Sequence, residues 1–302
     1  MKTVIMGAVS RATLVQVTTD ITVFIIVTIF ALLLSFNKLT AIQPYIRGFF
    51  CDDQSLMYPY RDDSISTITT AILSLLPPTI IILFTEAFLS KNDSKRMRIF
   101  VKNCYSMIGC LFLGFSLCVL FIEIVKMFVG RLRPHFFSVC QPSFSSTNCS
   151  RKFITNYSCQ GKDLESISDS KKSFPSGHSG AAWNGMVFLA IYIQIRVRRH
   201  WPRLRVACPL LQFVAVSVAA YVSISRLQDY KHHTGDVIGG GIIGILFTII
   251  VMYQNPNVKR HFLHHYDQAD LGETMDTVVC MELHQENKNS AEIPTINGQA
   301  KT

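Results

Sequence analysis

The chain has 302 residues, of which 49% are hydrophobic and 16% are charged, and its formal net charge is +9. Soluble domains carry about 25% charged residues, so this composition excludes an ordinary soluble domain and favours a polytopic membrane protein. A positive charge can indicate a nucleic-acid partner, but here the basic residues concentrate in two short loops. We therefore expect no nucleic-acid partner.

Six apolar stretches are long enough to cross a bilayer core, which takes roughly 20 residues. In chain order they are 13–36, 66–89, 103–128, 178–195, 206–224 and 235–253. The first stretch is too long for the core of a signal peptide, so we interpret it as a retained anchor. The fourth is the shortest. The predicted fold is all-α, with six transmembrane helices.

Two loops between these stretches are strongly basic: "SKNDSKRMRIFVK" (90–102) and "RVRRHWPRLR" (196–205). Short loops rich in Lys and Arg remain in the cytoplasm. This pattern predicts that both termini are cytoplasmic. The loops near 37–65, 129–177 and 225–234 are then predicted to lie on the outer face, extracellular or luminal.

The outer loops contain N-glycosylation sequons at Asn148 and Asn156, where we expect glycans. The sequon at Asn92 falls in an inner loop, where we expect none. Disulfides are permitted outside the cytoplasm. The sequence does not determine how the outer cysteines pair: Cys51, Cys140, Cys149 and Cys159.

Two regions differ in composition. Residues 1–255 contain all the apolar stretches and are predicted to form one membrane domain. Residues 256–302 lose the apolar periodicity and end in the polar segment "ENKNSAEIPTINGQAKT". Such composition predicts a disordered tail, cytoplasmic under this topology.

Three polar clusters fall at the outer ends of the apolar stretches. Each member has an ordinary explanation when taken alone: Lys126 as a snorkelling lysine, His178 as an interfacial histidine, and His232 with Asp236 as a helix-surface pair. Three clusters at one membrane surface disfavour that explanation. The clusters contain Lys126, Arg133 and Pro134; Pro175, Ser176, Gly177 and His178; and Ser225, Arg226, His232 and Asp236.

These residue types suit phosphate chemistry. Lys126, Arg133 and Arg226 offer three positive charges to a dianionic phosphate, and arginine can bind it through two hydrogen bonds. The stretch "PSGH" opens the fourth apolar stretch. We expect Ser176 to cap this helix and Gly177 to allow close backbone approach, because a helix N-terminus binds anions.

The two histidines would supply the reacting groups. One neutral imidazole can attack phosphorus, and one protonated imidazole can donate a proton to the leaving oxygen. Asp236 lies one helical turn after His232, so we expect it to hydrogen-bond the second ring nitrogen of His232. His178 is then expected to protonate the leaving group.

The three clusters resemble the signature K-x6-R-P … P-S-G-H … S-R-x5-H-x3-D of the type 2 phosphatidate phosphatase superfamily, which is related to vanadium haloperoxidases. Every signature position matches, and the resemblance extends over roughly residues 15–255. It includes "CDDQSLMYPY" (51–60) and "GRLRPHFFSVC" (130–140), which are similar to the lipid phosphate phosphatase branch.

The resemblance implies a six-span enzyme that removes phosphate from phosphatidate, lysophosphatidate, sphingosine 1-phosphate or ceramide 1-phosphate. It implies His232 as the nucleophile, His178 as the general acid and Asp236 as the orienting carboxylate. It also implies that no magnesium or other cofactor is needed. We expect the plasma membrane, with an internal membrane such as the endoplasmic reticulum as the alternative, and a homo-oligomer is compatible with the sequence. The phosphate-binding residues implied are Lys126, Arg133, Pro134, Ser176, Gly177 and Arg226.

Three functions are alternatives to a phosphatase: an inactive scaffold, a phosphotransferase and a transporter. A catalytically inactive scaffold would lack some of these residues, and all are present. A phosphotransferase would use the same phosphohistidine, and only the acceptor would distinguish it. A transporter binds its substrate near the bilayer midplane, whereas these charges lie at the ends of the apolar stretches.

Overall fold

The computed structural model describes residues 11–35, 44–91, 95–143, 152–255 and 258–259. The chain divides into two compact units, Met1–Asn255 and Pro256–Thr302. The first unit contains all the elements discussed below. The predicted disordered tail falls, except for Val258 and Lys259, outside the described residues.

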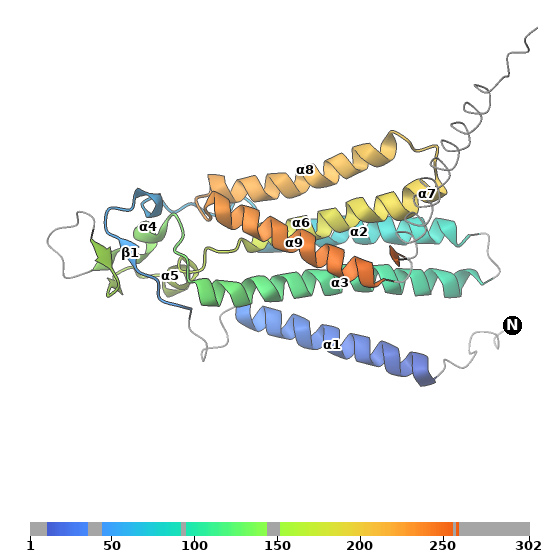
Figure 1. The fold of residues 1–302 in the computed structure, drawn as a ribbon, viewed down its shortest axis with the longest axis horizontal. Helices are drawn as coiled ribbons and strands as arrows, with labels where there is room; N and C mark the ends of the chain where they lie inside the picture. The colour runs from blue at the N-terminus through green and yellow to red at the C-terminus, as the bar shows by residue number, and fades with distance from the viewer. Residues whose placement is uncertain (1–10, 36–43, 92–94, 144–151, 256–257, 260–302) are drawn as a thin grey trace, which may run out of the picture. The chain divides into compact units, whose positions relative to one another are not determined.

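Six helices dominate the first unit, and Figure 1 shows them running alongside one another. They are α1 (Arg11–Ser35), α2 (Thr67–Leu89), α3 (Arg96–Val129), α6 (Gly177–Tyr192), α8 (Ala207–Gln228) and α9 (Thr234–Gln254). The predicted all-helical character is confirmed apart from a few very short strands. The predicted apolar stretches correspond to these helices.

Five of these helices, in the part of the chain that the structure describes, are long and apolar enough to cross a membrane: α1, α2, α3, α8 and α9. The predicted fourth span differs, because α6 has only 16 residues. At 1.5 Å per residue it is about 24 Å long, which is shorter than a bilayer core of about 30 Å. The helical path continues through a π-helical turn, η2 (Ile193–Val197), and α7 (Arg198–His200).

Helix α6 lies at the centre of the unit and packs against α2, α3, α8 and α9. Glycines allow the contact between α6 and α9. A Cβ atom on Gly240 would collide with the carbonyl oxygen of Ser176, and one on Gly244 with that of Gly180. Small residues at helix interfaces let two backbones approach closely. This close contact fixes the start of α6 beside the start of α9.

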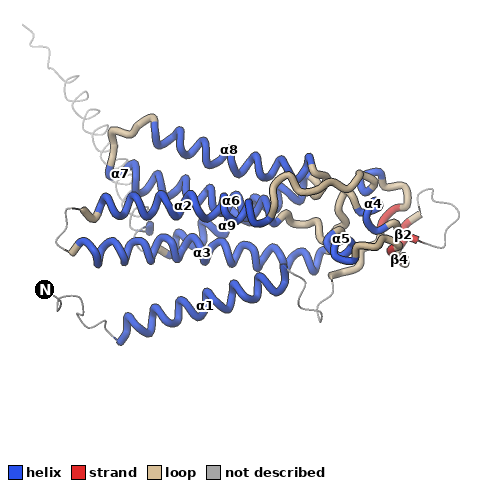
Figure 2. The backbone as a smooth tube through the Cα atoms, turned by 180° about the vertical axis from the view of Figure 1, so that it is seen from behind, coloured by secondary structure: helices blue, strands red, loops and turns tan. Residues whose placement is uncertain are grey.

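A small cap lies beyond one end of the helices, as Figure 2 shows. It contains η1 (Gln54–Leu56), α4 (Phe136–Cys140), α5 (Leu164–Asp169) and two antiparallel strand pairs. Strand β1 (Phe49–Phe50) pairs with β3 (Phe153–Ile154), and β2 (Pro142–Ser143) pairs with β4 (Ser158–Cys159). The cap core includes Phe49, Leu132 and Phe136.

Disulfides also hold the cap. Cys140 and Cys159 form a disulfide between α4 and β4. Cys51 is disulfide-bonded as well. Cys149 falls outside the described residues, as do the sequons at Asn148 and Asn92. Asn156 is exposed between β3 and β4, so its side chain is accessible, and its glycosylation remains a prediction.

Candidate active site

The three predicted polar clusters meet where α3 ends and where α6 and α9 begin. The backbone N–H of Ser173, just before α6, donates to the carbonyl of Arg131, just after α3, at 2.8 Å. The N–H of Ser176 donates to the carbonyl of Asp236 in α9 at 2.9 Å. The Nζ of Lys126 lies 3.4 Å from the position that a Cβ of Gly177 would take. Residues about 110 positions apart in the chain therefore form one site.

A glycine in the left-handed conformation ends α3 and turns the chain toward the site. Gly130 follows α3 with φ +56°, and its N–H donates to the carbonyl of Lys126 at 3.1 Å. A side chain here would be strained by this backbone conformation and would also collide with the carbonyl of Tyr45. Three residues later, the N–H of Arg133 donates to the carbonyl of Ser170 at 2.8 Å. The turn thereby places Arg133 beside the loop that leads into α6.

The segment before α6 forms the predicted helix cap. Ser176 is the N-cap, with an extended backbone, and its Oγ accepts from the N–H of Ser179 at 3.4 Å. The peptide bond between Phe174 and Pro175 is cis. The free N–H groups of a helix's first turn point along its axis. At this helix the Nζ of Lys126 lies 3.4 Å from the position of a Cβ on the first residue, Gly177, so the ammonium and the N–H groups are suited to bind the same anion.

His232 lies in the turn between α8 and α9, and its ring orientation is fixed by the backbone. Its Nδ1 lies 2.7 Å from the carbonyl oxygen of Ser173. A carbonyl oxygen only accepts hydrogen bonds, so Nδ1 carries the proton and Nε2 keeps its lone pair. Burial, followed by the charges of Arg133 and Lys126, lowers the pKa of His232 well below 6.5. The imidazole is therefore neutral, with Nε2 as its basic atom.

The expected hydrogen bond between Asp236 and His232 is wrong. The Oδ2 of Asp236 lies 3.9 Å from Nδ1 of His232, beyond hydrogen-bond distance. Instead Oδ2 accepts from Oγ of Ser173 at 2.6 Å and from the N–H of His233 at 2.9 Å, and Oδ1 accepts from Nη1 of Arg131 at 2.7 Å. Asp236 is at the third position of α9, where a carboxylate turns back to cap the first turn. Ser173 links the two residues, since its hydroxyl donates to Asp236 and its carbonyl accepts from His232.

The three predicted phosphate-binding cations are buried, and each is paired with a carboxylate. Lys126 Nζ lies 2.6 Å from Glu123, and Arg133 Nη2 lies 2.7 Å from Asp169. The Nε of Arg133 is buried without a hydrogen-bond partner. Burial would raise the pKa of Asp169, but the charges of Arg133 and Lys126 outweigh it and lower that pKa.

Arg226 is the most buried of the three, with 1% of its surface exposed. Its guanidinium donates to Asp63 at 2.9 Å, to Asp229 at 2.8 Å and to Oγ of Ser225 at 3.1 Å. A guanidinium has five N–H donors. Two donors therefore remain for another ligand.

His178 is the second residue of α6, and its Nε2 is buried without a hydrogen-bond partner. The charges of Arg226, Lys126 and Arg133 all act on its ring. His178 and His232 also interact electrostatically. Two imidazoles and three cations thus gather in one buried space, with unsatisfied polar atoms on His178 and Arg133.

The sequence that carries these residues matches a known protein family. The family model described as the PAP2 superfamily matches residues 107–260, which include all three clusters. The chain belongs to the PAP2 superfamily. This confirms the superfamily and the phosphatase activity that the signature predicts.

Relatives of this PAP2 phosphatase have related names. Phospholipid phosphatase 1 of Rattus norvegicus is 39% identical, over 69% of this chain and 75% of the relative. A putative phosphatidate phosphatase of Drosophila melanogaster is 34% identical, over 72% of this chain and 65% of the relative. Phospholipid phosphatase 2 of Homo sapiens is 34% identical, over 76% of this chain and 82% of the relative.

A solved structure also matches. It is a transmembrane PAP2-type phosphatidylglycerolphosphate phosphatase from Bacillus subtilis, 19% identical to this chain. The match covers 77% of this chain and 93% of the solved chain, with a TM-score of 0.33.

The segment between β1 and α2, residues 51–66, forms a strap that packs against one side of the PAP2 site. The ring of Tyr58 stacks on Tyr230 at 4.6 Å, and the N–H of Tyr58 donates to the carbonyl of Pro134 at 3.1 Å. Ser64 donates to Asp229, and Asp63 pairs with Arg226. Pro134 was predicted to bind phosphate, but a proline has no N–H to donate. Its observed contact is with the strap.

The sequence analysis did not identify several residues of this site. Arg131 was not singled out, yet it is bonded to Asp236. Ser173 lies two residues before the P-S-G-H part of the signature and supplies both a hydroxyl and a carbonyl. The carboxylates Glu123, Asp63 and Asp169 come from helix or loop positions that no signature marks. The spacing of Glu123 and Lys126, three residues apart, was a usable signal for one pair.

No metal site accompanies these residues in the described part of the chain. No three His, Cys, Asp or Glu side chains there gather as metal ligands. The independence of magnesium remains a prediction.

Proposed function

We propose that this protein is an integral-membrane lipid phosphate phosphohydrolase. Its proposed substrates are the phosphate monoesters of phosphatidate, lysophosphatidate, sphingosine 1-phosphate and ceramide 1-phosphate. The names of the relatives support a lipid phosphatase. The observation that carries the proposal is the pair of imidazoles among three buried cations: His232 is buried with Nδ1 bonded to a backbone carbonyl, and His178 is half-buried with a buried Nε2.

The proposed reaction begins at Nε2 of His232. This atom attacks phosphorus, the bond between phosphorus and the ester oxygen breaks, and a phosphohistidine forms. His178, protonated in the substrate complex, donates its proton to the leaving alkoxide. Neutral His178 then takes a proton from water, which attacks the phosphohistidine and releases inorganic phosphate. Both histidines return to their starting states.

The positive groups stabilise the charge that develops on the phosphoryl oxygens. Lys126, Arg133 and Arg226 approach from three different segments, and the first turn of α6 adds backbone N–H groups. The unpartnered Nε of Arg133 and the two remaining donors of Arg226 are suited to such oxygens. Because these groups supply the charge that magnesium supplies in other phosphatases, we propose that the reaction needs no metal ion.

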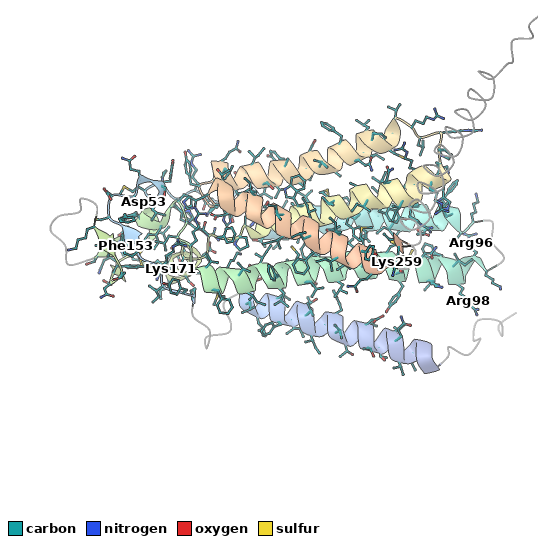
Figure 3. All side chains as sticks on the ribbon, in the orientation of Figure 1. Asp53, Arg96, Arg98, Phe153, Lys171 and Lys259 are labelled. Carbon is teal, nitrogen blue, oxygen red and sulfur yellow. A yellow bond between two sulfur atoms is a disulfide. The ribbon has the colours of Figure 1, made fainter. Side chains whose placement is uncertain are left out.

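We further propose that six helical segments cross the membrane, with α6, η2 and α7 together forming the fourth. The run from Gly177 to His200 is continuous in the chain and exceeds the roughly 20 residues that a bilayer core needs. The active site would face outward and both termini inward. Figure 3 places Arg96 and Arg98 at the opposite end of the unit from Phe153 and Lys171 of the cap. A disulfide in the cap supports its outer location, and we propose the plasma membrane.

The test is phosphate release from the four lipid phosphates by the full chain in detergent. We expect hydrolysis in the presence of excess EDTA and inhibition by vanadate, which mimics the five-coordinate phosphorus. A matched His232→Ala preparation should release no phosphate above background. Activity that disappears with EDTA and returns with magnesium or zinc would contradict the metal-free mechanism. Inactivity of the wild-type chain on all four lipids would contradict the proposed function.

A further inference from the structure

A buried carboxylate lies within the site that is proposed to bind a dianion. Glu123 precedes Lys126 by one turn of α3, and its Oε1 lies 2.6 Å from Nζ of Lys126. Both side chains are 11% exposed. A negative charge beside a phosphate repels it, so the reaction as described gives no reason for Glu123 to be there.

The position of the pair relates Glu123 to the phosphate site. The site of a Cβ on Gly177 would be 3.4 Å from Nζ of Lys126 and 4.0 Å from Oε1 of Glu123. The pair therefore lies against the first residue of α6. Lys126 also acts electrostatically on His178 and His232. Glu123 holds the lysine ammonium at the point where both imidazoles experience its charge.

Glu123 differs in exposure from two of the other carboxylates that pair with the site's cations. The side chains of Asp63 and Asp169 are 40% and 51% exposed. Glu123 is nearly enclosed, on a long helix, as Asp229 is at the end of α8. Ionisable groups buried in membrane helices are rare and mark functional sites.

The lysine itself explains why an anchor is needed. Its ammonium is a point charge on a flexible four-carbon stem, and Arg133 and Arg226 lie near the same imidazoles. Without a carboxylate, the repulsion from these guanidiniums would favour other rotamers that carry Nζ away from the start of α6. A carboxylate one turn earlier offsets that repulsion.

We propose that Glu123 is a positioning residue that holds Nζ of Lys126 at the start of α6 for the phosphoryl group. This inference rests on the proposed phosphatase function. Glu123 also acts electrostatically on buried Lys172, but Lys126 is the cation to which it is hydrogen-bonded, at 2.6 Å. When Lys126 is absent, the carboxylate loses this partner and its negative charge repels phosphate.

The test is a double-mutant cycle on turnover of a short-chain lysophosphatidate in detergent, normalised to folded protein. The variants are Glu123→Gln, Lys126→Ala and their combination. With Lys126 present, Glu123→Gln should lower kcat/KM, mainly through kcat, since the ammonium loses its fixed position. With Lys126→Ala, the same Glu123→Gln change should raise kcat/KM by about tenfold, because it removes a buried negative charge that repels the phosphate.

Two controls test whether the recovery comes from removing the charge at Glu123. One keeps that charge and changes the length of the side chain, and the other lowers the negative charge of the protein elsewhere. In the Lys126→Ala background, Glu123→Asp keeps the negative charge and should give no recovery. Asp62→Asn removes an exposed carboxylate for which the structure records no ion pair, and should also give none. If Lys126→Ala gives too little folded protein, Lys126→Gln takes its place in every arm.

The reversal of sign is the decisive result. A loss in both backgrounds would mean that Glu123 only supports the fold, and a gain in both would mean that it merely repels the substrate. No change in either would mean that Lys126 is held by other groups. Each of these outcomes overturns the inference, whereas inactivity of the wild-type chain would overturn the proposed function instead.

Discussion

Two buried charged clusters lie at opposite ends of the central helices, and they differ in how fully their hydrogen bonds are satisfied. At the end away from the cap, which is the proposed inner end, the carboxylate of Glu86 in α2 is fully buried. Its Oε1 accepts from Nε of Arg196 at 2.8 Å and from the hydroxyl of Tyr192 at 3.1 Å. Its Oε2 accepts from Nη2 of Arg196 at 2.6 Å and from Nδ2 of Asn103 at 2.9 Å. Four donors satisfy the two oxygens.

The cluster at the other end, where the cap lies, is incomplete. Nε of Arg133 and Nε2 of His178 are buried without hydrogen-bond partners. Buried polar atoms in folded proteins are nearly always satisfied, so these two atoms are suited to the phosphate that we propose as ligand. The cluster away from the cap joins α2, α3 and the extension of α6. Charge and burial are alike in the two clusters, and they differ in the two polar atoms, Nε of Arg133 and Nε2 of His178, that have no protein partner.

The largest effect is expected at His232. His232→Ala removes the attacking atom, and loss of a catalytic nucleophile lowers kcat by about 10⁴-fold or more. The loss should be similar for lipid phosphates and for p-nitrophenyl phosphate. Phosphate release from detergent-purified protein measures it, with His233→Ala as the neighbouring control. Substantial turnover by His232→Ala would mean that another residue is the nucleophile.

Arg226→Ala should have the next largest effect. Removal of one group that stabilises developing charge typically costs around 10²–10³-fold in rate. Arg203 offers a matched control, because Arg203→Ala removes an exposed guanidinium from the loop between α7 and α8, which lies at the opposite end of the helices from the cap (Figure 1). The kcat/KM of the two variants gives the comparison. Near-normal turnover by Arg226→Ala would mean that Arg226 has a structural role, as Arg196 has in the Glu86 cluster.

The pH dependence should reflect the lowered pKa of His232. Burial and the charges of Arg133 and Lys126 keep the imidazole neutral below pH 6.5. Attack requires the neutral form, so the acidic limb of kcat/KM should lie below the ordinary histidine value. Arg133→Gln removes one of the causes and should shift that limb to higher pH. A limb that stays in place in Arg133→Gln would mean that another group titrates there.

The smallest effect on activity is expected at the inner cluster. Arg196→Ala leaves the buried Glu86 without its charged partner, and breaking a buried ion pair costs about 3–5 kcal/mol of unfolding free energy. Thermal unfolding in detergent should show that loss, while kcat/KM per folded molecule stays near wild type. Adding Glu86→Gln should restore much of the stability. A lower kcat/KM in folded Arg196→Ala would contradict the separation of the two clusters, because the Glu86 cluster would then affect catalysis.

Much of this arrangement follows from the sequence, because apolar stretches and signature spacing are local features. The start of α9 and the cap at Ser176 were predicted within a residue or two. The partners of the charged residues were not, since Asp63, Asp169 and Glu123 reach the site from three separate segments. Tertiary packing decides those pairs.

Asp236 illustrates how a correct residue can be given the wrong contact. Its spacing from His232 fits a side-chain pair one turn apart, but that rule holds within a helix, and His232 lies before α9 begins. At the third helical position the carboxylate instead bonds to the N-cap backbone.

The length of α6 was also not predicted from the sequence. A π-helical turn at Ile193–Val197 interrupts an apolar stretch that looks continuous in the sequence.

The most direct test of the two histidine roles compares a lipid phosphate with p-nitrophenyl phosphate. A lipid alkoxide is a poor leaving group and needs a proton, whereas p-nitrophenolate leaves readily without one. His178→Ala should therefore lose far more activity on the lipid than on the activated ester, and acid-labile phosphohistidine should be trapped from that ester in His178→Ala and never in His232→Ala. Equal losses on both substrates for His178→Ala, or a phosphoenzyme in His232→Ala, would contradict the account.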